Sequence, residues 1–197
     1  MTRRTVGILV FDDAEVLDVC GPYEVFSVAG RRDGMEPFDV RLLSHRGAPV
    51  TARNGFVMTP HGALGGAPID VLVVPGGWGT RRAQHDDALI DAIREAAAGA
   101  ELVLSVCTGS LLLGRAGLLD GLDATTHHSA FDELREAAPT AQVRPGARFT
   151  DNGRVLTSAG IAAGIDLALH VVERLLGREL ADEASRYMEF PRSGAAR

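Results

Sequence analysis

Three segments carry groups able to do chemistry, each directly after a short hydrophobic run. Cys107 follows the run 102–106, Asp18 lies soon after the first run of the chain, and Gly76 and Gly77 follow the run Val71–Val74. In open α/β sheets, ligands bind at the carboxyl ends of the strands, where loops lead into helices. If these runs are neighbouring parallel strands, the thiol, the carboxyl group and the glycine amides face one site.

Cys107 lies between a predicted strand and a predicted apolar helix with almost no connecting residues. This layout is typical of a nucleophile elbow, a strained turn that projects one side chain toward a helix N-terminus. Backbone N–H groups and the helix dipole there lower a thiol pKa, so we predict an exposed, ionised Cys107. Thr108 follows, with its N–H placed to face an oxyanion and its hydroxyl placed to hold substrate or water. The alternative is that Cys107 is a small buried core residue.

Asp18 stands in an apolar stretch just before the expected helix start at Gly21. We predict a half-buried acid that shares its proton with Cys107. Asp18 is alternatively a helix-start residue that accepts hydrogen bonds from nearby amides. Glu24, one turn into that helix, is a competing acid.

Two further groups are expected to touch the substrate. The turn with Gly76 and Gly77 offers amides without side chains, suited to an oxyanion hole, although it is alternatively an ordinary strand-to-helix turn. His127 and His128 follow the short predicted strand Ala124–Thr126. Because neighbouring side chains point to opposite faces of a strand, one histidine, His127, is expected to line the pocket and the other to face solvent. No further ligands cluster with them, so no metal site is predicted.

Short strand-like runs alternate with helical stretches along the chain. This alternation predicts a mostly parallel sheet covered by helices on both faces, in one α/β domain over residues 1–197. Asn152-Gly153 between two β-rich runs predicts a hairpin. The predicted strands are 6–11, 38–43, 56–58, 71–74, 102–106, 124–126, 148–150 and 155–157, and the predicted helices are 21–30, 86–98, 111–116, 130–137, 161–176 and 178–189.

Composition excludes several classes of protein. The 197 residues carry a formal net charge of -6, which argues against a nucleic-acid-binding surface. All 20 basic residues are Arg, so lysine Schiff-base chemistry and a P-loop lysine are ruled out. Two cysteines are too few for a disulfide framework or a four-thiolate metal site. No apolar run reaches the ~20 residues of a membrane span. We therefore expect a cytoplasmic protein without membrane or nucleic-acid partners.

Taken together, these motifs make the chain resemble the ThiJ/PfpI superfamily, whose domain is similar to that of class I glutamine amidotransferases. The resemblance implies a flavodoxin-like three-layer α/β/α sandwich with Cys107 as the functional thiol at the nucleophile elbow. It also implies a homodimer. The matching segments are 6–11 with Asp18, 21–26, 70–77, 105–110, 124–127 and 157–160.

Asp18 with Cys107-Thr108 is similar to the isonitrile hydratase branch of the superfamily. This similarity implies a lyase that adds water to an isonitrile, giving an N-substituted formamide, through Cys107, Asp18 and Thr108 and without a metal or cofactor. The peptidase branch carries histidine at the position of Thr108. Two alternatives stay open: a glyoxalase-, deglycase- or redox-stress-like protein using the same thiol, and a non-catalytic small-molecule sensor related to AraC-type regulators.

Overall fold

A seven-stranded sheet forms the centre of the structure, a computed structural model that describes residues 3–31 and 34–192. All neighbouring strands are parallel except β10 and β11, so the predicted mostly parallel sheet is confirmed. In spatial order the strands are β10 (Phe149–Asp151), β11 (Val155–Ser158), β7 (Leu102–Val106), β6 (Val71–Val74), β1 (Arg4–Val10), β2 (Phe38–Ser44) and β5 (Gly62–Ala63).

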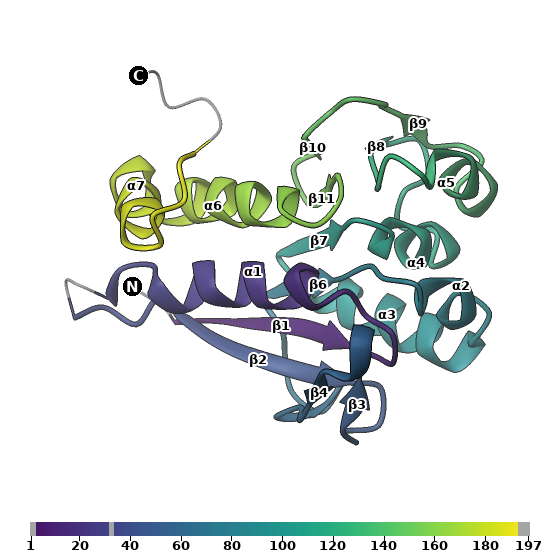
Figure 1. Cartoon of the computed structure of the whole chain (residues 1–197), viewed down its shortest axis with the longest axis horizontal. Helices are drawn as coiled ribbons and strands as arrows, with labels where there is room; N and C mark the ends of the chain where they lie inside the picture. Colours follow the sequence, from purple (N-terminus) through teal and green to yellow (C-terminus); the bar gives the residue numbers. More distant parts are fainter. Residues whose placement is uncertain (1–2, 32–33, 193–197) are drawn as a thin grey trace.

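Helices cover both faces of this sheet, which completes the three-layer sandwich (Figure 1). Helices α1 (Val16–Val28), α6 (Ala163–Leu176) and α7 (Arg178–Tyr187) pack against one another on one face. The other group consists of α2 (Thr80–Ala83), α3 (Asp87–Gly99), α4 (Gly109–Arg115) and α5 (Phe131–Ala137). The chain crosses to opposite faces after β1 and after β6. This change of direction makes the carboxyl ends of these two strands a topological switch point, the place where such sheets bind ligands.

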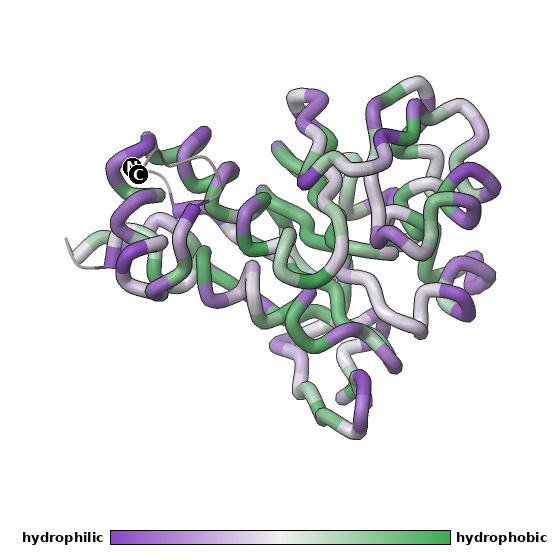
Figure 2. The backbone as a smooth tube through the Cα atoms, turned by 45° about the horizontal axis from the view of Figure 1, so that its top comes forward, coloured by the Kyte–Doolittle hydropathy of each residue, from purple (hydrophilic) through white to green (hydrophobic). Residues whose placement is uncertain are grey.

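The central strands are hydrophobic because they are covered on both faces. Every residue of β6 and of β7 is buried. Figure 2 shows hydrophobic segments through the middle of the molecule and hydrophilic segments at its periphery. The core therefore holds the strand ends that carry the candidate site residues in fixed positions.

The first helix begins earlier than the sequence predicts. We expected it to start at Gly21, because Gly-Pro is a frequent helix-start signal, but α1 begins at Val16 and continues through Pro22. Pro22 lacks an N–H and so cannot donate to the carbonyl of Asp18, four residues before it. Because α1 begins at Val16, Asp18 lies inside the first turn of this helix and not ahead of it.

Two of the short predicted strands belong to small sheets outside the main one. The expected edge strand at Phe56–Met58 is β4 (Val57–Met58), which pairs with β3 (Val50–Thr51) outside the main sheet. The strand expected before the histidines is β8 (Asp123–Ala124), which pairs with β9 (Gln142–Val143). A 3-10 turn at Arg53–Gly55 completes the described elements. The predicted Asn-Gly hairpin is confirmed by the antiparallel pair β10–β11.

In the part of the chain that the structure describes, no helix is long and apolar enough to cross a bilayer.

Candidate active site

Cys107 occupies a sharp turn between β7 and α4, as the elbow layout predicts. Its φ of 56° lies in the left-handed region that side-chain-bearing residues rarely adopt. Backbone hydrogen bonds hold this conformation: the Cys107 N–H lies 3.2 Å from the carbonyl oxygens of both Ser158 and Ala159. The Cys107 carbonyl accepts hydrogen bonds from the hydroxyls of Thr126, at 3.0 Å, and Ser110, at 3.2 Å.

The sulfur lies among polar groups although Cys107 is buried. Cys107 is only 5% exposed, so the predicted exposed thiol is wrong: the surrounding loops and strand ends cover it. The N–H groups of Thr108 and Ile161 donate to its thiol, and the carboxyl group of Asp18 lies within hydrogen-bonding reach. The site therefore brings Cys107 and Asp18 together, as the sequence predicts.

The predicted ionised thiol is wrong. Burial, and then the charge of Asp18, raise the pKa of Cys107 to about 12, although the N–H groups of Thr108 and Ile161 act in the opposite direction. Helix α4 has only seven residues, and its N-terminal dipole does not outweigh burial beside a carboxyl group. This raised pKa favours the protonated thiol at neutral pH.

Asp18 is fully buried and not half-buried as predicted, and one of its carboxyl oxygens has no partner among the described residues. The N–H of Gly76 donates to Asp18 Oδ2 at 3.0 Å, whereas Asp18 Oδ1 has no hydrogen-bond partner among the described residues. A buried carboxyl oxygen without a partner is costly in a structure that serves only stability. Oδ1 is thus available to carry a proton to or from a bound molecule.

Burial also changes the titration of this carboxyl group. Loss of solvation, assisted by the nearby charge of Glu15, raises the pKa of Asp18 to about 7, while the Gly76 N–H and Cys107 oppose the rise. Such a group exchanges protons readily at neutral pH. The competing acid Glu24 is exposed on the same helix.

The glycine turn after β6 positions Asp18 and Thr108. The N–H of Gly77 donates to Thr108 Oγ1 at 3.0 Å, and the Thr108 hydroxyl lies 3.2 Å from the Gly77 carbonyl oxygen and 3.1 Å from Thr80 Oγ1. A Cβ atom on Gly76 would lie 2.5 Å from the backbone nitrogen of Thr108 and 2.9 Å from Asp18 Oδ2. Only glycine allows this close approach.

These contacts alter two expected roles. The N–H groups of Gly76 and Gly77 already donate within the site, so their predicted part as a free oxyanion hole does not fit the geometry. The Thr108 hydroxyl, in a residue that is 2% exposed, is likewise engaged by the turn. Only the backbone N–H of Thr108 reaches the sulfur.

His127 lies at the partly exposed rim, but the expectation that it and His128 point in opposite directions is wrong. Their ring centroids are 4.1 Å apart. The reason is that β8 ends at Ala124, so both histidines lie in a loop without strand alternation. The His127 ring packs on Gly160, where a Cβ would meet it at 2.3 Å. Burial, and then the charges of His128 and Arg81, lower the pKa of His127.

Sequence reasoning missed two residues of the site. Ile161, also at a positive φ of 51°, donates its N–H to the sulfur, and Glu15 raises the pKa of Asp18. The segment after β11 could have been recognised as part of the site. Strand β11 pairs in parallel with β7, and its last residue, Ser158, lies opposite Val106, the residue before Cys107. Among the described residues, no group of three or more His, Cys, Asp or Glu side chains is arranged to hold a metal ion.

The chain is similar to several known proteins. Residues 4–174 match the DJ-1/PfpI family. An isonitrile hydratase of Pseudomonas putida is 37% identical over 187 residues, which cover 94% of this chain and 78% of that protein. The transcriptional regulator GbdR of Pseudomonas aeruginosa is 32% identical over 190 residues, or 96% of this chain, but the chain spans only 51% of its length.

A solved structure shares the fold of this chain. A crystal structure of a ThiJ/PfpI family protein from Pseudomonas syringae superposes with a TM-score of 0.86 at 30% identity, covering 100% of this chain and 78% of that one. Both the sequence match and the superposition include the elbow, the first turn of α1 and the glycine turn. The chain belongs to the DJ-1/PfpI family.

Proposed function

We propose that this chain is an isonitrile hydratase, a lyase that converts R–N≡C and water into the formamide R–NH–CHO. The observation that carries the proposal is the buried Asp18 carboxyl group against the Cys107 thiol, with Oδ1 unpartnered and a pKa of about 7. The terminal carbon of an isonitrile needs both a nucleophile and a proton, and this pair supplies both at one point. The similarity to the Pseudomonas putida isonitrile hydratase supports the same reaction.

The first step adds the thiol across the terminal carbon. The Asp18 carboxylate takes the proton of Cys107 and delivers it to that carbon as the sulfur bonds to the same atom. The product is the thioimidate R–N=CH–S–Cys107, and Asp18 returns to the carboxylate. The Thr108 and Ile161 N–H groups stabilise the negative charge that passes through the sulfur.

The second step consumes water. Asp18 accepts a proton from the attacking water and passes it to the nitrogen, giving R–NH–CH(OH)–S–Cys107. The carbon–sulfur bond then breaks as the hydroxyl proton travels through Asp18 back to the sulfur, which releases R–NH–CHO and restores the thiol. Every proton is accounted for with one carboxyl group and one thiol, and the scheme uses no cofactor. The proposal assigns to His127, which is partly exposed, the contact with the R group.

A second candidate is a non-catalytic sensor of small molecules. The similarity to GbdR favours it, because the chain aligns with about half of that regulator. A redox-stress role is disfavoured by the raised pKa of Cys107, since oxidant-sensing cysteines react as thiolates.

Product analysis tests the hydratase proposal. Purified protein is incubated with cyclohexyl isonitrile, and N-cyclohexylformamide is quantified by mass spectrometry. We expect catalytic turnover that Asp18→Asn lowers by at least about a hundredfold, in line with loss of general acid–base catalysis. Glu24→Gln, which removes an exposed acid from the same helix, is the matched control and is expected to retain activity. Binding without formamide in the wild type would instead support the sensor.

We further propose that the protein is a cytoplasmic homodimer. Exposed apolar side chains near the N-terminus of α1, such as Leu17 at 39%, are consistent with a subunit interface. Sedimentation equilibrium checks this assembly: a mass of one chain over the micromolar range would contradict it.

A further inference from the structure

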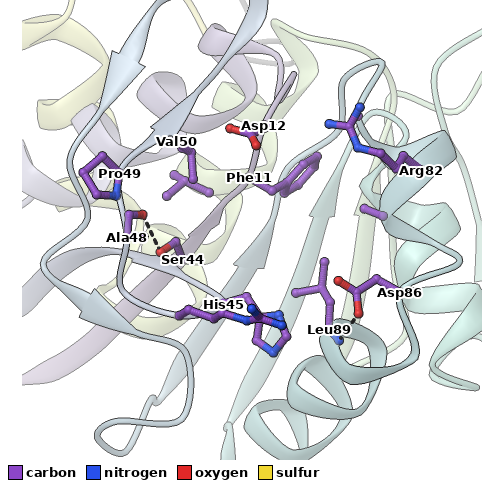
Figure 3. A pocket seen from close by; sticks show the side chains of 14 residues that line it. Phe11, Asp12, Ser44, His45, Ala48, Pro49, Val50, Arg82, Asp86 and Leu89 are labelled. Atoms are coloured by element: carbon purple, nitrogen blue, oxygen red, sulfur yellow. Dashed lines mark hydrogen bonds between the residues drawn. The ribbon is translucent and has the colours of Figure 1, made fainter.

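A separate cavity lies at the carboxyl ends of β1 and β2 (Figure 3). It has a volume of about 340 Å³, within the range of small-molecule sites. Its walls come from the ends of β1 and β2, the loop that leads to β3, helix α2 and the start of α3. None of Cys107, Asp18 and Thr108 lines it.

A wall of backbone and aromatic ring bounds the cavity on the side of α2. A Cβ atom on Gly79 would lie 2.0 Å from the Asp12 carbonyl oxygen and 3.1 Å from the Phe11 ring, so these segments are in direct contact. Because the lining also lacks Cys107, Asp18 and Thr108, the cavity is distinct from the thiol site, and its occupant need not react with Cys107.

The floor of the cavity is formed by buried apolar side chains. Phe11, Ala83 and Leu89 line it and are only 8%, 9% and 4% exposed. Figure 3 shows Phe11, Val50 and Leu89 around the same open space. Such a surface favours the hydrocarbon or ring portion of a ligand.

The two carboxylates of the lining already have partners. Asp12 Oδ1 accepts the N–H of Thr51 at 2.8 Å, and Asp86 Oδ1 accepts the N–H of Leu89 at 3.2 Å as the N-cap of α3. These bonds stabilise the loop and the helix end, and they reduce what the two acids offer to a cationic ligand.

The hydrogen-bond donors of the lining are far less engaged. Within residues 3–31 and 34–192, the side chains of His45 and Arg46 make no hydrogen bond or ion pair. Arg82 has one exposed partner, Asp13, at 3.5 Å. His45 and Arg46 therefore offer hydrogen-bond donors to a ligand, and Arg presents its donors in the fork geometry that matches a carboxylate.

We infer that this cavity binds a small organic carboxylate, with its apolar body on Phe11 and Leu89 and its carboxylate on Arg46 and His45. An anion alone would leave the apolar floor uncovered, and an apolar molecule alone would leave the donors unpaired. A compound that combines the two features fits the lining in both respects.

Benzoate is a suitable probe. Titration of the ¹⁵N-labelled protein with sodium benzoate is expected to shift the amide signals of residues 44–50 and 82–89. Benzamide has the same shape without the charge and is expected to bind at least about tenfold more weakly, the usual loss for a charge-assisted hydrogen bond. Arg46→Ala is expected to weaken benzoate binding by a similar factor.

Arg41→Ala is the matched control, because Arg41 lies on β2, the strand that leads to Arg46, pairs with Asp39 and does not line the cavity. It is expected to leave benzoate binding unchanged. Equal affinities for benzoate and benzamide, or shifts confined to the amides around Cys107, would overturn the inference. Binding of inorganic phosphate without binding of benzoate would overturn it as well.

Discussion

At the scale of single residues, the proton shared by Asp18 and Cys107 sets how the site responds to pH. The reactive form of the pair holds one proton. Below a pH of about 7, the pKa of Asp18, a second proton is added and Asp18 no longer accepts the thiol proton.

The pH dependence of kcat/KM for isonitrile hydration follows from this pair. It is expected to rise tenfold per pH unit up to about pH 7 and then to stay level through pH 9, because the pKa of Cys107 is raised to about 12. Initial rates of formamide formation check the profile. A fall between pH 7 and pH 9 would show that the thiol ionises more easily than its surroundings imply.

The same carboxyl group makes stability depend on pH. Its pKa is raised from 3.8 to about 7 on folding, so the folded state holds the proton more tightly than the unfolded state. Stability is therefore lost as pH rises from about 4 through 7. Asp18→Asn is expected to gain, relative to the wild type, up to a few kcal/mol in free energy of unfolding between pH 4 and pH 8. Urea denaturation at both pH values measures the difference, and no gain would contradict the raised pKa.

At the scale of elements, the glycine turn after β6 connects the acid to the elbow. Gly76→Ala places a Cβ 2.5 Å from the Thr108 nitrogen, which neither backbone can relieve without moving Asp18. We expect a loss of about 1–3 kcal/mol in stability, the range for overpacking, together with a loss of activity. Gly62→Ala is the control, because nothing lies within 4 Å of its Cβ position. Thermal melts that are equal for both variants would contradict this tight contact.

The segment before β10 is joined to α6 by one partly buried ion pair. Arg148 Nε donates to Asp166 Oδ2 at 2.7 Å, and the Asp166 side chain is 4% exposed. Arg148→Ala leaves that carboxylate buried and unpaired, at a cost of about 2–4 kcal/mol after allowance for the exposed side of Arg148. Arg135→Ala breaks a pair with the 95% exposed Asp132 and is expected to cost less than about 0.5 kcal/mol. Chemical denaturation compares the two, and similar losses would refute the special role of the buried carboxylate.

Elements with a strong local signal were predictable from the sequence. The buried runs of β6 and β7, the Asn-Gly hairpin and the strand-to-helix position of Cys107 all follow from hydrophobicity and turn chemistry. The start of α1 was not, because Pro22 signals a helix start locally and is tolerated here inside a helix packed against α6.

The protonation state of Cys107 could not be predicted from the sequence. The position of Cys107 at the N-terminus of a helix predicts a thiolate. Burial has the larger effect on the pKa of Cys107, however, and burial depends on the surrounding loops. In the same way, the use of the Gly76 and Gly77 amides follows from long-range contacts to Asp18 and Thr108. Short-range patterns contain no information about such partners.

At the scale of the whole molecule, the seven-stranded sheet joins segments from Arg4 to Ser158, and α6 and α7 pack on α1. We predict that residues 1–197 unfold as one domain in one cooperative step. Differential scanning calorimetry is expected to give a calorimetric enthalpy equal to the van't Hoff enthalpy. Two resolved transitions would show that the described elements form separate units.

The most direct measurement compares two cysteine variants for formamide production from cyclohexyl isonitrile. Cys107→Ala removes the sulfur at the elbow, and Cys20→Ala removes the exposed cysteine of α1. Turnover is predicted to fall to the uncatalysed background in Cys107→Ala and to match the wild type in Cys20→Ala. Formamide production by Cys107→Ala at a rate near that of the wild type would contradict the bond between this sulfur and the isonitrile carbon.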